Sequence, residues 1–152
     1  KDNDYQLIWR TGKYYYDKAV EDVRNNGLEE RIKCTVFIDR MDLAYSAADV
    51  VISRAGAMSI SELSLLNKAV VFVPLPTAAE DHQTKNAMRL VEANAAVMVN
   101  NNATEKELLP VVFDLLKDSE KLEMLKENIV RFAKPNAAED IVNQIELILN
   151  KQ

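Results

Sequence analysis

Short apolar runs rich in β-branched and aromatic residues alternate along the chain with longer segments whose apolar residues recur at helical spacing. Runs of the first kind are typical of buried strands, and segments of the second kind are typical of amphipathic helices. The predicted strands cover residues 5–9, 33–38, 50–53, 70–74 and 96–99. The predicted helices cover residues 13–26, 41–48, 57–66, 82–93, 104–117, 119–132 and 137–149.

Strands that alternate with helices of 10–15 residues indicate βαβ crossovers and a mainly parallel sheet with helices on both faces. The almost continuous apolar character of the strands agrees, because parallel strands are buried on both sides. The predicted fold class is therefore α/β, doubly wound and Rossmann-like. Ligands of such sheets bind at the carboxyl ends of the strands. The places to inspect are residues 11–12, 38–41, 53–57, 74–83 and 99–102.

Composition removes several classes of function. The 152 residues suit one domain, and the net charge of −5 argues against a basic nucleic-acid-binding surface. The three glycines, Gly12, Gly27 and Gly56, are too far apart to form either of the glycine-rich nucleotide-binding motifs, GxGxxG and GxxxxGK(S/T). A single cysteine, Cys34, forbids an internal disulfide and a multi-cysteine zinc site, and a single histidine, His82, excludes histidine-rich metal sites. No apolar run approaches the roughly 18–20 residues that span a bilayer.

The segment SRAGAMSISE, residues 53–62, is the most informative. A strand ends, Gly56 provides a turn, and a helix begins at once, so its exposed N–H groups and positive dipole end form a ready anion site. Arg54 adds a possible bidentate partner for a phosphate. The alternative is purely structural, because Ser59 and Glu62 have the spacing of a capping box.

The segment PLPTAAEDHQTKNA, residues 74–87, carries side chains that hydrogen-bond sugar hydroxyls, namely Asp81, His82, Gln83 and Asn86. His82 is either a general base, a helix-capping residue or a solvated side chain, and the base is the least favoured of these. Consecutive residues rarely converge on one ion, so no metal site is predicted at Glu80 and its two neighbours.

A third segment, FIDRMDLAY at residues 37–45, places Ile38 at the carboxyl edge of the sheet. There its backbone groups are in a position to read a flat heterocycle, while Asp39 or Asp42 caps the short helix that follows. The residues by themselves thus give an α/β domain with an anion site, and they do not name the ligand.

The blocks FIDRMDLAYSAADVVISRAGAMSISEL and VVFVPLPTAAEDHQTKNA, together with IWRTGK and KPNAAEDIV, resemble the C-terminal half of the MurG family. These enzymes are UDP-N-acetylglucosamine–N-acetylmuramyl-(pentapeptide) pyrophosphoryl-undecaprenol N-acetylglucosamine transferases. The resemblance covers nearly the whole chain. It implies that residues 1–152 are the UDP-GlcNAc-binding domain of a GT-B glycosyltransferase, truncated at its N-terminal edge and lacking its first βα unit.

The resemblance also implies the chemistry. An inverting, metal-independent transferase moves GlcNAc from UDP-GlcNAc to the muramyl 4-hydroxyl of lipid I, which makes the peptidoglycan precursor lipid II. The enzyme is expected to be cytoplasmic and peripheral at the inner face of the bacterial plasma membrane. The acceptor and the catalytic base belong to an N-terminal domain that this chain lacks, so the chain alone is expected to be inactive.

Matching positions imply a role for each donor-binding residue. The Ile38 backbone would read the uracil edge beside Met41, and Glu62 would bind the ribose hydroxyls. Gln83 would hold the sugar, and Arg54 would support the loop. The diphosphate would lie at the helix start, formed by Gly56, Ala57, Met58 and Ser59.

Two other interpretations remain open at this stage. Another GT-B member, such as a UDP-sugar epimerase or a natural-product glycosyltransferase, has the same kind of anion site. A receiver-like or flavodoxin-like regulatory domain has the same order of elements, although Asp39 lacks the acidic cluster that a receiver needs. A missing first strand would lie centrally, between the second and the fourth, so the truncated chain is also expected to self-associate.

Overall fold

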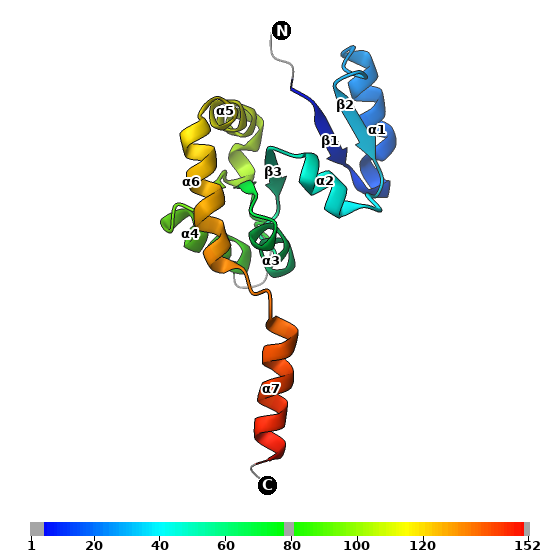
Figure 1. Ribbon diagram of the computed structural model, residues 1–152. Helices are drawn as coiled ribbons and strands as arrows, with labels where there is room; N and C mark the ends of the chain where they lie inside the picture. The colour runs from blue at the N-terminus through cyan, green and yellow to red at the C-terminus, as the bar shows by residue number, and fades with distance from the viewer. Residues whose placement is uncertain (1–4, 78–80, 151–152) are drawn as a thin grey trace. The chain divides into compact units, whose positions relative to one another are not determined.

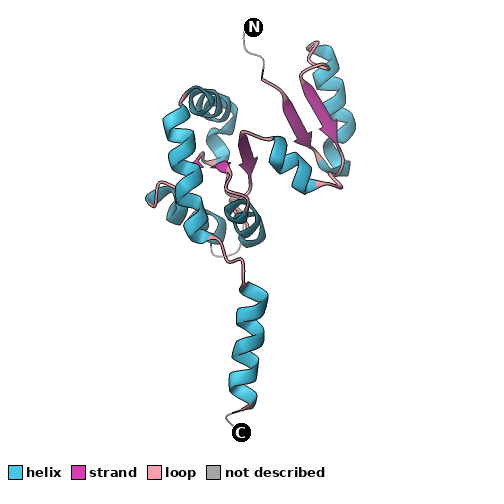
Figure 2. Cartoon of the chain, in the orientation of Figure 1, coloured by secondary structure: helices cyan, strands magenta, loops and turns pink. Residues whose placement is uncertain are grey.

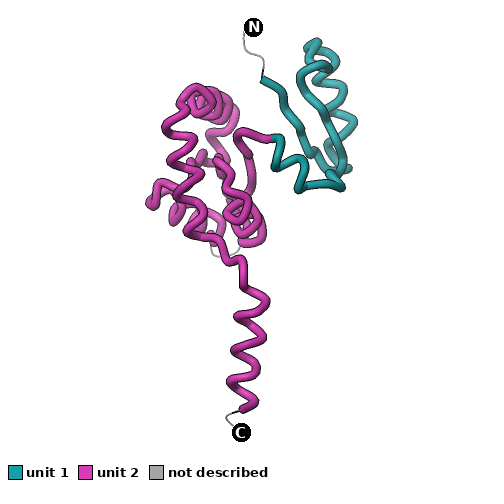
Figure 3. The backbone as a smooth tube through the Cα atoms, in the orientation of Figure 1, with its two compact units in different colours: residues 1–47 teal, residues 48–152 magenta. Residues whose placement is uncertain are grey.

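The computed structural model describes residues 5–77 and 81–150, which fall into two compact units, residues 1–47 and 48–152 (Figures 1 and 3). The first unit contains β1 (Leu7–Arg10), α1 (Gly12–Asn25), β2 (Ile32–Thr35) and α2 (Met41–Ala47). Its two strands are parallel, with Leu7 opposite Ile32. This unit is therefore one complete βαβ crossover followed by a short helix.

Helix α1 ends where the sequence predicts. Gly27 has a φ of +63°, the left-handed conformation that favours glycine after a helix. Its N–H donates to the Arg24 carbonyl, and the N–H of Leu28 donates to the Val23 carbonyl at 3.0 Å. These bonds satisfy the last carbonyls of the helix and turn the chain toward β2.

The second unit contains a three-stranded parallel sheet in the order β3-β4-β5 (Figure 2). The strands are β3 (Val50–Ser53), β4 (Ala69–Phe72) and β5 (Val97–Met98). The helices are α3 (Ala57–Leu65), α4 (His82–Glu92), α5 (Thr104–Lys117), α6 (Ser119–Ile129) and α7 (Ala137–Leu149), with short 3₁₀ turns η2 (Asn101–Ala103) and η3 (Val130–Phe132). The sheet has three carboxyl ends that lie side by side, and each one leads into a helical segment.

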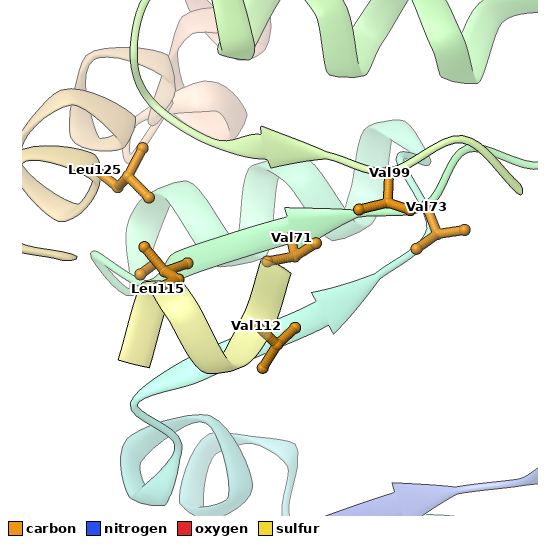
Figure 4. Close-up of a cluster of buried hydrophobic side chains, with 7 residues drawn as sticks. Val71, Val73, Val99, Val112, Leu115 and Leu125 are labelled. Atoms are coloured by element: carbon orange, nitrogen blue, oxygen red, sulfur yellow. The ribbon is translucent and has the colours of Figure 1, made fainter. Parts of the chain in front are cut away.

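The core of the second unit is built around β4. All four of its residues have no exposed surface, and successive strand residues point to opposite faces, so the strand is covered on both sides. On one face Val71 packs with Val112 and Leu115 of α5 and with Leu125 of α6 (Figure 4). A strand buried in this way explains the uninterrupted apolar run in the sequence.

The α/β class and the parallel pairing are confirmed. The five predicted strands form, but all four residues of β1 are exposed, so the expectation that the strands are buried on both sides is wrong for β1. Strand β2 ends at Thr35 instead of residue 38, where Thr35 Oγ1 donates to the Phe37 carbonyl and the chain leaves the sheet. Among the described residues, the strands form two separate sheets, and β1 is not paired with β3.

The amphipathic α7 contains no buried residue. Every residue from 137 to 150 is exposed, including Ile141, Ile145 and Ile148. Its stripe of apolar residues is therefore not part of the core in this structure. Over the described ranges, no helix is both long and apolar enough to cross a membrane.

Candidate functional site

The turn from β3 into α3 forms the centre of the site. Gly56 is the N-cap residue, with extended backbone angles (φ −71°, ψ 150°), and its carbonyl accepts from the Ile60 N–H at 3.0 Å. The N–H groups of Ala57, Met58 and Ser59 have no acceptor within the helix, because they belong to its first turn. A glycine N-cap supplies no side chain to satisfy them. The helix start is therefore open to an anion.

The capping-box interpretation of this segment is wrong. Ser59 is the third residue of α3 and not its N-cap, and no side-chain cap hydrogen bond is formed there. Glu62 lies one turn further along the same side of the helix and is exposed. Glu62 is therefore an exposed residue of the second turn of α3.

Arg54 joins the carboxyl ends of the three strands of the second unit. It follows β3 directly, and its Nη1 donates to the carbonyls of Val73 and Pro74, which follow β4, at 3.1 and 3.2 Å. The same nitrogen donates to Asn101 Oδ1 in η2, after β5, at 2.7 Å. This arrangement suits a residue that supports the loop, which is the role implied by the resemblance.

Two side chains from α4 hold the neighbouring loops. Asn86 Nδ2 donates to the Ala55 carbonyl at 3.2 Å, which fixes the backbone just before the N-cap of α3. Gln83 Oε1 accepts from the Leu75 N–H at 2.9 Å, which fixes the loop after β4. Gln83 is half-buried and keeps its amide nitrogen as a donor.

The start of α4 carries the remaining polar candidates. Asp81 is the N-cap residue in the left-handed conformation (φ 57°), and no side-chain cap hydrogen bond is formed there. His82 is the first helical residue and is exposed. Glu80 lies outside the described residues. Within the described ranges, no group of three histidine, cysteine or acidic side chains is arranged to hold a metal ion.

The first unit carries the two residues predicted to bind a base. Ile38 lies three residues beyond the end of β2, in the loop that leads to α2, and Met41 is the first residue of that helix. Both are half-buried. Between them Arg40 pairs with Asp42 through two hydrogen bonds of 2.9 and 2.5 Å, and this pairing lowers the pKa of the Asp42 carboxyl.

Asp42 thus has an arginine partner at the start of α2, where the sequence suggested a cap. The bidentate pair links the loop before α2 to the first turn of that helix. The roles of Ile38 and Met41 in reading a base stay predictions. Sequence reasoning gave no role to Asn101, although residues 99–102 were among the places to inspect; an amide side chain directly after a strand was the available signal.

The start of α3 is open, a carboxylate lies one turn away, and two amide side chains of α4 hold the loops after β3 and β4. The chemistry of this α/β site suits an anionic, hydroxyl-rich ligand. Residues 1–145 match the glycosyltransferase family 28 C-terminal domain. The chain belongs to this family, and the resemblance to MurG proteins is confirmed.

Curated relatives carry a more specific name. The chain is 50% identical, over 151 residues, to the UDP-N-acetylglucosamine–N-acetylmuramyl-(pentapeptide) pyrophosphoryl-undecaprenol N-acetylglucosamine transferase of Parabacteroides distasonis. That alignment covers 99% of this chain and 40% of the relative. The protein of the same name from Porphyromonas gingivalis is 47% identical over 148 residues, with 96% and 38% of the two chains covered. The chain therefore spans about 40% of the length of these relatives.

Solved structures agree on the fold. The crystal structure of Acinetobacter baumannii MurG superposes with a TM-score of 0.81 at 31% identity, over 93% of this chain and 42% of that one. Anabaena Alr3699/HepE, solved in complex with UDP, gives a TM-score of 0.64 at 20% identity, over 96% and 40% of the two chains. The second likeness shows the fold alone.

Proposed function

We propose that this chain is the donor-binding part of an inverting glycosyltransferase that moves GlcNAc from UDP-GlcNAc to the muramyl 4-hydroxyl of lipid I and so forms lipid II. The observation that carries the proposal is the start of α3, where three N–H groups face no intrahelical acceptor and the N-cap has no side chain. The family membership and the names of the relatives support the choice of donor and acceptor.

The chemistry requires the donor site to stabilise the leaving UDP. Cleavage of the bond between the sugar and the β-phosphate leaves negative charge on UDP, and donors already aimed at that position stabilise the charge without reorganisation. The N–H groups of Ala57, Met58 and Ser59 supply such donors, and the helix dipole adds to them. No metal ion is required in this scheme, because the helix start takes the place of a cation.

The other contacts give the site its specificity. A carboxylate accepts from both hydroxyls of a ribose, which suits Glu62 one turn beyond the helix start. Gln83 is suited to grip the GlcNAc hydroxyls through its amide group, while Asp81 and Asn86 are further candidates at the same loop. The contact of Glu62 would be a hydrogen bond to a hydroxyl, so its loss should weaken binding without unfolding the domain.

The base that deprotonates the acceptor hydroxyl is not assigned to this chain. The base must lie within hydrogen-bond reach of the hydroxyl that attacks. His82 stands beside Gln83, on the donor side of the reaction, and so is a poor candidate. The acceptor is a lipid-linked sugar, so we place the reaction at the inner surface of the plasma membrane, where the enzyme would be peripheral.

Calorimetric titration of the complete protein with UDP-GlcNAc in the presence of EDTA tests the proposal. We expect saturable binding without a divalent ion, and weaker binding of UDP-glucose, which lacks the acetamido group. Preference for a different sugar nucleotide would favour another GT-B member. Failure to bind any uridine nucleotide would refute the proposal and favour a flavodoxin-like binding module.

A further inference from the structure

Asn101 makes the shortest of the three hydrogen bonds at the Arg54 guanidinium. Its Oδ1 accepts from Arg54 Nη1 at 2.7 Å, whereas the carbonyls of Val73 and Pro74 lie at 3.1 and 3.2 Å from the same nitrogen. One Nη1 carries two hydrogens, so three acceptors must share them. The Asn101 carboxamide is thus the best-placed acceptor for one of these hydrogens, and the two backbone carbonyls share the other.

The position of Arg54 in the chain makes this contact relevant to the helix start. Its backbone lies two residues before the N-cap Gly56, and its side chain reaches the segments that follow β4 and β5. Ala55 lies between Arg54 and Gly56, and its carbonyl accepts from Asn86 Nδ2 at 3.2 Å. The backbone that leads into α3 is therefore held by one side chain from α4 and by a guanidinium that Asn101 anchors.

We propose that Asn101 is a positioning residue for donor binding: it holds the Arg54 guanidinium on the loop after β4 and thereby fixes the helix start at which the diphosphate binds. This inference rests on the proposed function. Without Asn101 the guanidinium keeps only two longer hydrogen bonds to neutral carbonyls. The guanidinium is then no longer tied to η2, and the β3–α3 turn and the loop after β4 are held together less firmly.

The consequence is specific to one part of the donor. UDP and UDP-GlcNAc reach the helix start with their β-phosphate, whereas UMP lacks that group and the sugar. Replacement of Asn101 by alanine should therefore weaken UDP and UDP-GlcNAc by about 3- to 10-fold, the effect of one hydrogen bond. The affinity for UMP should change by less than about twofold.

The experiment compares variants of the complete protein by calorimetric titration with UMP, UDP and UDP-GlcNAc, and by thermal melting. Asn101→Asp keeps an oxygen acceptor for the guanidinium and should restore the affinity of UDP-GlcNAc to within about threefold of the unchanged protein. The matched control is Asn102→Ala, an exposed amide in the same 3₁₀ turn, which should change neither affinity nor melting. If Asn101→Ala does not fold, Asn101→Ser replaces it.

Several outcomes would overturn the role of Asn101. These are an unchanged affinity for UDP-GlcNAc in Asn101→Ala, equal losses for UMP and UDP-GlcNAc, or a loss that Asn101→Asp does not repair. Tighter binding would mean that the released guanidinium contacts the diphosphate directly, and it too would refute the role. The proposed function fails separately, and the inference with it, if the unchanged protein binds none of the uridine nucleotides.

Discussion

Removal of the Glu62 carboxylate should weaken the donor and leave the fold intact. In Glu62→Ala the helix loses an exposed side chain that lies outside the first turn, so the free energy of unfolding should change by no more than about 0.5 kcal/mol. A carboxylate that accepts from a ribose hydroxyl contributes about 1.5–3 kcal/mol, as hydrogen bonds to charged groups do. This corresponds to a loss of roughly 10- to 150-fold in affinity.

UDP titration beside thermal melting of the complete protein measures both quantities. Glu62→Gln keeps an oxygen acceptor without the charge and should lose only part of the affinity. Glu127→Ala is the matched control, because Glu127 is an exposed glutamate on α6 of the same unit. An unchanged affinity for UDP in Glu62→Ala would refute the ribose role. A large fall in melting temperature would show that Glu62 supports the fold.

Three further predictions concern the helix start, the histidine and the chain itself. A Cβ added at Gly56 meets no atom within 4 Å, and the φ of −71° suits alanine. Gly56→Ala should therefore change the free energy of unfolding by no more than about 1 kcal/mol, yet it should bind UDP-GlcNAc more weakly because the methyl group occupies the approach to the helix start. Equal donor affinity would place the diphosphate elsewhere. His82→Ala should retain measurable turnover in the complete protein, and a loss of kcat by several orders of magnitude with intact donor binding would make His82 the base. The isolated 152-residue chain should show no transferase activity. It should also self-associate, because β1 and β3 each have an unpaired edge among the described residues. Light scattering at micromolar concentration tests the self-association, and a clean monomer would contradict it.

The elements themselves were largely determined by local sequence. The predicted bounds of β3, α5 and α7 coincide with the structure, and Gly27 ends α1 as predicted. Hydrophobic spacing and glycine conformation act over a few residues, so they are visible in the sequence before any tertiary contact forms. The family resemblance likewise rested on short blocks of contiguous residues, and the comparisons confirm it.

Tertiary structure decided how the site is organised. The sequence left a capping role for Ser59 open, and the structure rejects that role because Gly56 is the N-cap of α3. The contact of Arg54 with Asn101 joins residues 47 positions apart, and no local pattern encodes it. It depends on β3, β4 and β5 being neighbours in a parallel sheet, whose carboxyl ends bring three loops together. Sequence spacing shows which residues follow each strand, but only strand order determines which of them meet.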